Sequence, residues 1–346
     1  MEHNIPFIFL EIILALSIVS MNVLVCATVY LHKELRTVTN FLIVSLAAAD
    51  IGVGAVAIPF SIVLSMEYTL CFYTCIFITC FPLVTTQFSI LLLLLIAINA
   101  HLKIRLPNSY SLHVTNVRVF LAVVLCLLLS CLIALSPMMG WNQFQQYVNG
   151  NRSLQNLASE RSMVGYPRPS PVIDLSGAYF SHKEADNNSG IQGEHLGCCS
   201  LTAVFSPEYL VYFVFFGCTL LPLFIMLAIY GNIFRVARSH LRSAKRWEAH
   251  MACTLLLLVG MFCLCWIPLN VINSLRLLCW SCSIPVNLIH VAVIFSHMNS
   301  FANPLVYAMR KKDFGGALRS VCLDLLTCWS PVKACCRKTK VHPQNG

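Results

Sequence analysis

The sequence predicts an all-α membrane protein, a seven-transmembrane helix bundle followed by a short amphipathic eighth helix. Two observations lead to this fold class. The chain is 58% hydrophobic and only 11% charged over 346 residues, and its apolar residues gather into long runs. A soluble domain carries about 25% charged residues. With less than half of that, a globule of this size has too little polar surface to face water, so lipid is the expected solvent.

The apolar runs are long enough to cross a bilayer, which takes about 20 mostly apolar residues in a helix. The first run is too long for a signal peptide and has no basic start. A β-barrel would alternate with a period of two, whereas stretches such as 91–95 are continuously apolar. The runs cover residues 6–31, 41–66, 71–102, 117–139, 207–236, 249–278 and 284–309.

Charge placement predicts the orientation in the membrane. With an extracellular N-terminus, 18 of the 23 Lys and Arg residues fall on the cytoplasmic side and five on the other, as the positive-inside rule requires. The net charge of +9 then comes from basic residues along the cytoplasmic surface, where they face anionic membrane lipids. No soluble basic module remains to bind nucleic acid. We expect a multi-pass plasma-membrane protein with a receptor-like domain over residues 1–310 and a cytoplasmic tail over 311–346.

The segments outside the bundle carry candidate modification sites. The outer loop 141–206 contains two Asn-x-Ser sequons, at Asn151 and Asn187, both accessible to luminal glycosylation. Residues 311–326 read as an amphipathic helix along the inner leaflet. Cys322 and Cys328 lie beside that surface, where they are either palmitoylated or reduced thiols.

Ionisable residues inside the spans indicate function because burying a charge in lipid is costly. Glu11, Asp50 and His297 are such residues, and each needs a partner inside the bundle. Asp50 ends the string Leu46-Ala47-Ala48-Ala49-Asp50. Spans five to seven hold Pro222 followed by Tyr230, then Cys265-Trp266-Ile267-Pro268 and Asn303-Pro304-Leu305-Val306-Tyr307.

These motifs, each in the right span and order, resemble those of the rhodopsin-like G-protein-coupled receptors. Within that class the chain is similar to the adenosine receptors, nearest to type 3. The similarity covers all seven spans. It is carried by strings such as Phe72-Tyr73-Thr74-Cys75, Pro137-Met138-Met139-Gly140-Trp141-Asn142 and Phe295-Ser296-His297-Met298-Asn299-Ser300. The resemblance implies a receptor for adenosine or a related purine nucleoside that couples to a heterotrimeric G protein.

The resemblance also implies a ligand site near the outer ends of the spans. Asn273 would pair with the adenine edge, because a carboxamide offers one donor and one acceptor. Ser296 and His297 would hold ribose hydroxyls, Thr86 would contact the deeper ribose end, and Glu11 would orient His297. Apolar walls are implied at Leu83, Leu269, Trp266 and Val293, with Leu201 at the loop position where the family stacks a phenylalanine on adenine.

A sodium site and an inner switch are implied lower in the bundle. Asp50 would ligate a sodium ion with Ser89 and Asn299, since a hard cation takes oxygen ligands. An ion-free hydrogen-bond network of Asp50, Asn299 and Asn303 is the alternative, and the sequence leaves both open. Flanking or switch roles are implied for Trp266, Ser300, Asn303, Tyr307, Tyr230 and Glu248.

Six of the 18 cysteines are disulfide candidates at the outer face. The family alignment pairs Cys75 with Cys199, and a second bridge could join Cys71 to Cys198. Because Cys198 and Cys199 are adjacent, sequence does not decide the connectivity. Similar receptors close a small ring at the positions of Cys279 and Cys282.

One departure from the family affects signalling. Span three ends with Asn99-Ala100-His101 where the family has Asp-Arg-Tyr, so Ala100 cannot contact a G protein or restrain Glu248. Coupling is therefore expected to be weakened or atypical, and the alternative is a non-signalling decoy or dimerisation partner. A transporter would show internal repeats, and an enzyme would need a nucleophile–base pair or metal site; neither pattern is present in the sequence.

Overall fold

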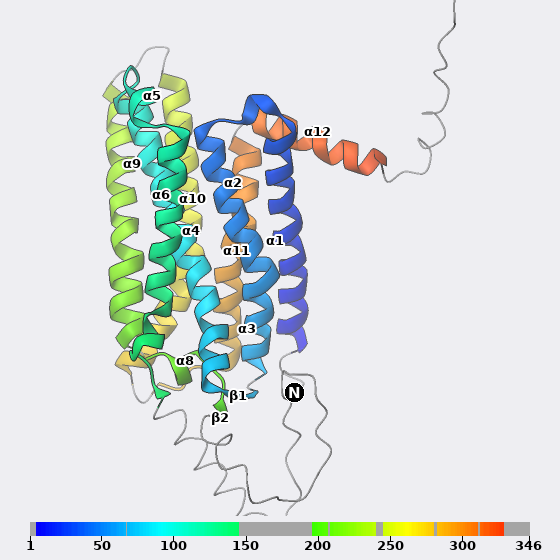
Figure 1. The fold of residues 1–346 in the computed structure, drawn as a ribbon, viewed down its shortest axis with the longest axis vertical. Helices are drawn as coiled ribbons and strands as arrows, with labels where there is room; N and C mark the ends of the chain where they lie inside the picture. Colours follow the sequence, from blue (N-terminus) through cyan, green and yellow to red (C-terminus); the bar gives the residue numbers. More distant parts are fainter. Residues whose placement is uncertain are drawn as a thin grey trace, which may run out of the picture.

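The protein is described by a computed structural model that covers residues 5–66, 68–144, 196–206, 208–239, 245–279, 282–310 and 312–328. Its helices run side by side in an elongated bundle (Figure 1). The first half contains α1 (Ile5–Leu31), η2 (Lys33–Leu35), α2 (Val38–Gly52), the π-helical η3 (Val53–Ala57), α3 (Ile58–Ser65), α4 (Phe72–Arg105), α5 (Tyr110–His113), α6 (Asn116–Leu135) and η4 (Ser136–Met139).

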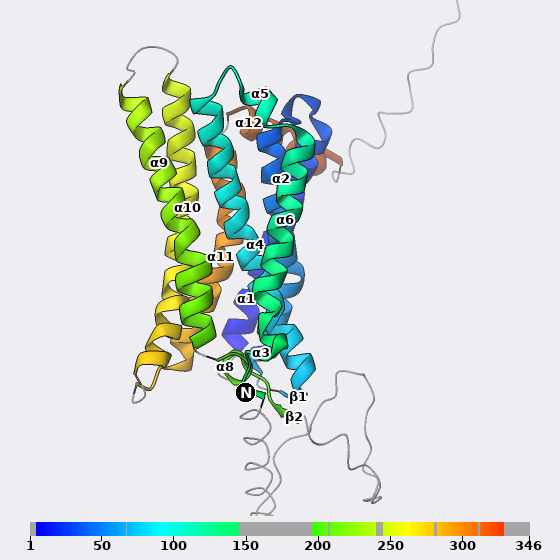
Figure 2. The same cartoon turned by 60° about the vertical axis from the view of Figure 1, so that its left-hand side comes forward.

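The second half follows the outer insert. It contains α8 (Leu201–Val204), the π-helical η5 (Tyr209–Leu220), α9 (Leu221–Ser239), α10 (Lys245–Leu278), α11 (Val286–Arg310) and α12 (Lys312–Cys328). Strands β1 (Thr69–Cys71) and β2 (Leu196–Cys198) form a small antiparallel sheet. Figure 2 shows α9 and α10 lying side by side along the bundle.

The expected spans match the observed helices. Six of the described helical segments are long and apolar enough to cross a membrane: Ile5–Leu31, Val38–Ser65, Phe72–Arg105, Asn116–Met139, Tyr209–Ile233 and Leu257–Leu278. Helix α11 is the seventh member of the bundle, although the polar residues that it carries lower its hydropathy. It packs against α10 and α1, and the predicted seven-helix fold is confirmed.

The two ends of the bundle differ. The start of α1 and the β1–β2 sheet lie at one end, and α5 and α12 lie at the opposite end (Figure 1). Helix α12 leaves the bundle axis and runs sideways, as an amphipathic helix on a membrane surface does. Its apolar face is buried at Phe314, Leu318 and Val321, and the Phe314 ring lies 6.5 Å from the ring of Tyr307.

Close contact between α1 and η3 depends on a glycine. A Cβ atom at Gly54 would lie 2.8 Å from Cγ2 of Val19 and 3.0 Å from the carbonyl oxygen of Ala15. Only a hydrogen atom fits there, so the π-helical turn approaches α1 more closely than a helix with a side chain could. This contact places the outer part of the second span against the first.

Apolar packing fills the bundle in two main layers. The inner layer contains Ala100, Tyr230, Phe262 and Tyr307, and the outer layer surrounds Cys75 and Cys199. One face of α6, by contrast, leaves large apolar side chains exposed, which suits a surface solvated by lipid rather than water. These residues include Leu121, Leu125, Leu128 and Leu132.

The structure forms two disulfides at the outer end. Cys75 is bonded to Cys199, and Cys279 is bonded to Cys282. The suggested second bridge between Cys71 and Cys198 is not formed among the described cysteines. The sheet register sets Cys71 opposite Leu196 and Cys198 opposite Thr69. Diagonal neighbours lie about 7–8 Å apart, farther than the roughly 4.4–6.8 Å between Cα atoms that a disulfide spans.

Candidate ligand-binding site and inner switch

A buried acid–histidine pair joins α1 to α11. Nδ1 of His297 lies 2.9 Å from Oε2 and 3.0 Å from Oε1 of Glu11. The Glu11 residue is 0% exposed and His297 is 7% exposed. Both residues were expected to need an intramembrane partner, and the fold supplies each to the other. Neither Glu11 nor His297 therefore faces lipid without a polar partner.

The pair fixes how the imidazole can act. A carboxylate only accepts hydrogen bonds, so the hydrogen of His297 sits on Nδ1 and is donated to Glu11. In a neutral imidazole, Nε2 is then an acceptor. A histidine held in one orientation and one tautomer offers a defined acceptor to a ligand hydroxyl.

A second contact lies next to this pair on the same two helices. The rings of Phe7 and His290 stack with centroids 4.2 Å apart and an interplanar angle of 20°. Phe7 precedes Glu11 by four residues, and His290 precedes His297 by seven, so each helix presents both of its residues on one face. Sequence reasoning missed Phe7 and His290, although this spacing could have pointed to them.

In two other predicted ligand residues, the side-chain hydroxyl donates a hydrogen bond to a backbone carbonyl oxygen. Ser296, 4% exposed, donates to the carbonyl oxygen of Val293 at 2.7 Å. Thr86, 8% exposed, donates to the carbonyl oxygen of Pro82 at 2.8 Å. Both hydroxyl oxygens keep acceptor capacity for a ligand donor.

The remaining predicted ligand residues lie on the expected helices. Asn273 is half-buried in α10, seven residues along the chain from the half-buried Trp266. The Nε1 atom of Trp266 is buried and has no hydrogen-bond partner among the residues that the structure describes. Leu201 lies in α8, but its side chain falls outside the described residues. Half-buried apolar positions are Leu83 on α4, Leu269 on α10 and Val293 on α11.

A polar network lies deeper in the bundle. Asp50 is 0% exposed, and its Oδ2 accepts a hydrogen bond of 2.9 Å from Nδ2 of Asn303. Asn22 donates to the carbonyl oxygens of Ile18 at 2.9 Å and Ser300 at 3.1 Å. These contacts join α1, α2 and α11. The Asp50–Asn303 part of the alternative ion-free network is therefore present.

The network leaves oxygen atoms that suit a hard cation. Among the described residues, Oδ1 of Asp50, Oδ1 of Asn299 and Oδ1 of Asn303 are buried without a hydrogen-bond partner. Ser89 on α4 is also buried, at 3% exposed. Unpartnered buried oxygens are costly, and a carboxylate with carbonyl and hydroxyl oxygens is the donor set that hard cations take. The residues present fit the implied sodium ion.

The inner switch is packed with apolar side chains. Ala100, 1% exposed, belongs to the same buried cluster as Tyr230 and Tyr307. The Tyr307 hydroxyl is buried without a partner among the described residues. Glu248 lies in the first turns of α10, and its side chain falls outside the described residues.

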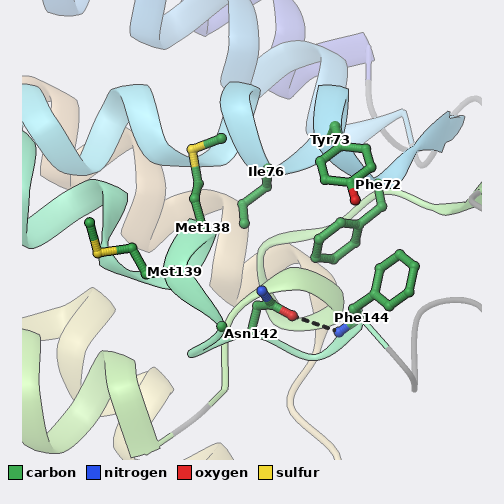
Figure 3. A pocket seen from close by; sticks show the side chains of 8 residues that line it. Phe72, Tyr73, Ile76, Met138, Met139, Asn142 and Phe144 are labelled. Atoms are coloured by element: carbon green, nitrogen blue, oxygen red, sulfur yellow. Dashed lines mark hydrogen bonds between the residues drawn. The ribbon is translucent and has the colours of Figure 1, made fainter.

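A separate hollow of about 410 Å³ lies at the outer ends of α4 and η4 (Figure 3). The side-chain carbonyl of Asn142 accepts a 3.0 Å hydrogen bond from the backbone N–H of Phe144. None of the predicted ligand residues lines this hollow, and no charged side chain does. The hollow is therefore separate from the Glu11–His297 pair. The lining residues are Phe72, Tyr73, Ile76, Met138, Met139, Gly140, Asn142 and Phe144.

Comparison with known proteins defines the class. Residues 21–156 and 175–307 match the family model of the 7 transmembrane receptor (rhodopsin family), which is more than half of the chain. The fold and this match establish a multi-pass membrane receptor of the rhodopsin family, a family of receptors and not of enzymes.

Whole-chain relatives narrow the class further. The chain is 37% identical to human adenosine receptor A2a over 355 residues, covering 98% of this chain and 78% of the relative. It is 38% identical to adenosine receptor A2b of Gallus gallus, with coverage of 89% and 85%, and 35% identical to that of Bos taurus, with coverage of 93% and 91%. The chain belongs to the adenosine receptor family. Its expected nearness to type 3 stays a prediction.

Proposed function

We propose that this receptor binds adenosine or a related purine nucleoside at the plasma membrane, with its N-terminus outside. The observation that carries the proposal is the buried Glu11–His297 pair. Burying a carboxylate between two spans is costly, and a ligand that binds to the imidazole which this carboxylate orients accounts for the pair. The relatives' name, adenosine receptor, supports the same ligand class.

The chemistry of a nucleoside matches the side chains in place. The Nε2 acceptor of His297 receives a ribose hydroxyl, and the hydroxyl oxygens of Ser296 and Thr86 are further acceptors. The Asn273 carboxamide pairs with the adenine edge, because it supplies a donor and an acceptor together. Leu201 gives apolar contact where an aromatic ring would add stacking of about 0.5–1.5 kcal/mol.

Ligand binding to membranes that contain the receptor tests this proposal. We expect saturable binding of a radiolabelled adenosine analogue, with roughly 100-fold weaker binding for His297→Ala and for Asn273→Ala, since each removes contacts to a polar ligand. The matched control for His297→Ala is His113→Ala, an exposed histidine on α5. Absence of saturable binding to the wild-type receptor would refute the ligand assignment.

We also propose that Asp50, Ser89 and Asn299 hold a sodium ion, flanked by Trp266, Ser300 and Asn303. The ion, when bound, would balance the charge of the buried carboxylate. Oxygens of Asp50 and Asn299 that have no partner within the described part of the chain support a sodium ion over the ion-free network. The Asp50–Asn303 hydrogen bond is compatible with a sodium site and with an ion-free network. A sodium titration of the receptor's thermal stability distinguishes the two.

We further propose that coupling to a heterotrimeric G protein is weakened or atypical. Ala100 is buried in an apolar cluster and has no charge with which to contact a partner or to hold Glu248. Nucleotide exchange on purified G proteins, compared between wild type and Ala100→Arg, measures this. We expect little exchange with wild type and more with Ala100→Arg. Robust exchange by the wild type would contradict weakened coupling and would also exclude the alternative, a non-signalling decoy or dimerisation partner.

The surface modifications are part of the same proposal. Asn151 and Asn187 lie outside the described residues, and we propose that they are glycosylated on the extracellular side. Cys322 is half-buried on α12, which ends at Cys328, and we propose palmitoylation of both. Glycosidase treatment shifts the apparent mass if a sequon is occupied, and hydroxylamine releases the thioester-linked acyl chains if the tail is acylated.

A further inference from the structure

The hollow at the outer ends of α4 and η4 has the size of a small-molecule site. Its volume is about 410 Å³, and ligand pockets typically measure roughly 300–1,000 Å³. Phe72 and Ile76 form a buried floor, at 3% and 1% exposed, whereas Tyr73 and Met138 form an exposed rim, at 60% and 49%. A ligand that enters at the rim therefore reaches the packed outer layer of the bundle.

The wall of the hollow opposite α4 is fixed before any ligand arrives. The Asn142 carboxamide donates to the carbonyl oxygen of Pro137 at 2.7 Å and accepts from the backbone N–H of Phe144 at 3.0 Å. The Phe144 ring meets the Phe72 ring with centroids 4.9 Å apart and an interplanar angle of 78°. Because these contacts hold the wall in one shape, the hollow is preorganised, which lowers the cost of binding.

Aromatic rings and thioethers dominate the lining. Figure 3 shows the rings of Phe72, Tyr73 and Phe144 on one side of the hollow and the thioethers of Met138 and Met139 on the other. Aromatic rings attract further rings in edge or offset contacts, and thioether sulfur atoms make favourable contacts with rings. No charged side chain is among the described lining residues, so a charged ligand would lose its hydration without gaining a partner.

The rim of the hollow continues into the surface that faces lipid. Phe77, one turn along α4 from Tyr73, is exposed, and so are Leu132 and Leu135 on α6. The two helices pack against each other, and their exposed apolar side chains suit lipid rather than water. An apolar ligand therefore reaches the hollow through the membrane, in which it concentrates.

We propose that this hollow is a second ligand site, which takes a flat, uncharged aromatic molecule from the outer leaflet. A flexible acyl chain loses more conformational freedom on binding than a rigid ring system does. A sterol is rigid, but its aliphatic rings gain less than an aromatic ring from three aromatic side chains and two thioethers.

The hollow is connected to the loop that carries Leu201, and the effect of its ligand on that loop rests on the proposed nucleoside function. The backbone N–H of Gln143 donates to the carbonyl oxygen of Val204 at 3.0 Å, and Asn142 pairs with Phe205 in an isolated antiparallel bridge. Helix α8 begins at Leu201 and ends at Val204. A ligand that holds this wall in place should therefore raise nucleoside affinity roughly five-fold, the lower end of usual couplings between sites.

Photolabelling of the full-length receptor in lipid nanodiscs tests the site with benzophenone, an uncharged diaryl ketone. Peptide mass spectrometry should find adducts on residues 72–76 and 138–144 that saturate with benzophenone concentration. Biphenyl should compete for them, whereas benzoate, which is charged, and cholesterol should not. Because benzophenone reacts readily with methionine, the exposed Met66 beyond the end of α3 is the internal control and should show no saturable labelling.

A filling variant locates the binding in the hollow. Met138→Trp should remove the saturable adducts on residues 72–76, and with them the effect of biphenyl on the affinity for a radiolabelled adenosine analogue. Met66→Trp is the matched control and should change neither. Competition by biphenyl in the wild type needs no variant, so the test does not depend on whether Met138→Trp folds.

Three results would overturn the site: labelling that rises without saturation at the hollow and at Met66 alike, competition by cholesterol, or unchanged saturable labelling in Met138→Trp. Saturable labelling with no effect of biphenyl on nucleoside affinity would overturn the coupling to the loop. Absence of nucleoside binding would contradict the proposed function and leave the labelling results unaffected.

Discussion

Glu11 and His297 are separated by 286 residues in the chain and by 2.9 Å in the structure, where Oε2 of one meets Nδ1 of the other. The contact fixes the relative rotation of α1 and α11, because both partners must face inward. It also turns a flexible imidazole into a preorganised acceptor. A ligand that binds to it does not have to select among rotamers, which lowers the entropic cost of binding.

The first prediction separates orientation by Glu11 from direct ligand contact. Glu11→Gln keeps one acceptor oxygen but removes the charge, so we expect nucleoside affinity to fall about ten-fold, the effect of one weakened hydrogen bond. In a His297→Ala background the same change should have no effect, because the residue that Glu11 orients is gone. Glu34→Gln, an exposed acid on η2, is the control for charge removal. Equal losses in both backgrounds would show that Glu11 contacts the ligand itself.

The second prediction concerns cation binding at Asp50. Sodium should stabilise the wild-type receptor against heat, because a ligand bound only by the folded state raises the melting temperature. Asp50→Asn should abolish the sodium dependence while keeping a hydrogen bond with Asn303. Titration with NaCl against choline chloride at constant ionic strength measures the difference. An identical response of both proteins would favour the ion-free network.

The third prediction addresses the packing around Ala100. A long side chain inserted into a filled core destabilises by about 1–3 kcal/mol, and an unpaired buried charge costs several kcal/mol more. Ala100→Met should therefore lower the melting temperature modestly. Ala100→Arg should lower it further unless an acid such as Glu248 pairs with the new charge. A melting temperature of Ala100→Arg above that of Ala100→Met would show that such an acid is within reach.

A fourth prediction tests the choice between adjacent cysteines. Cys199→Ser should lower the unfolding temperature, because it opens the bridge to Cys75 that closes a loop of 124 residues, worth roughly 2–5 kcal/mol. Cys198→Ser is the matched control and should leave the melting temperature close to wild type. Peptide mapping under non-reducing conditions should recover Cys75 linked to Cys199. Recovery of Cys75 linked to Cys198 would reverse the assignment.

A fifth prediction uses the contact at Gly54. Gly54→Val should destabilise the bundle by more than about 1–3 kcal/mol, because even a Cβ atom would lie 2.8 Å from Cγ2 of Val19. Gly260→Val, on α10, is a suitable comparison since a Cβ there meets no atom within 4 Å. Equal melting temperatures of the two variants would show that α1 and η3 can separate without penalty.

The helices were predictable from the sequence because lipid requires long apolar runs, and these are visible without knowing the packing. The Glu11–His297 contact was expected as well, but from the resemblance to the adenosine receptors, because the residues alone indicate only that each needs a partner inside the bundle. The Phe7–His290 stack and the Gln87–Thr219 hydrogen bond of 3.3 Å were not. Such contacts depend on how far each helix is rotated about its axis, and apolar runs without a polar face do not specify this.

The prediction of a second outer disulfide, between Cys71 and Cys198, was wrong for a similar reason. Sequence places Cys71 and Cys198 in neighbouring segments, but their pairing depends on strand register, which the positions of cysteines do not define. In the same way, the sequence shows Asn99 only as a replacement for the aspartate that the family has at this position. Only the fold shows that a carboxamide there serves both Thr39 and Tyr110.

The buried Phe314, 1% exposed, has a mechanical consequence. It anchors α12 beside Tyr307, near the end of α11, and a Cβ atom at Gly315 would collide with the carbonyl oxygen of Ala308 on the same helix. Any rotation of the inner end of α11 is therefore transmitted as a lever movement of α12 across the leaflet surface. The energy of that movement depends on the lateral pressure of the surrounding lipid, so the composition of the bilayer becomes one of the variables that set the balance between the receptor's conformations.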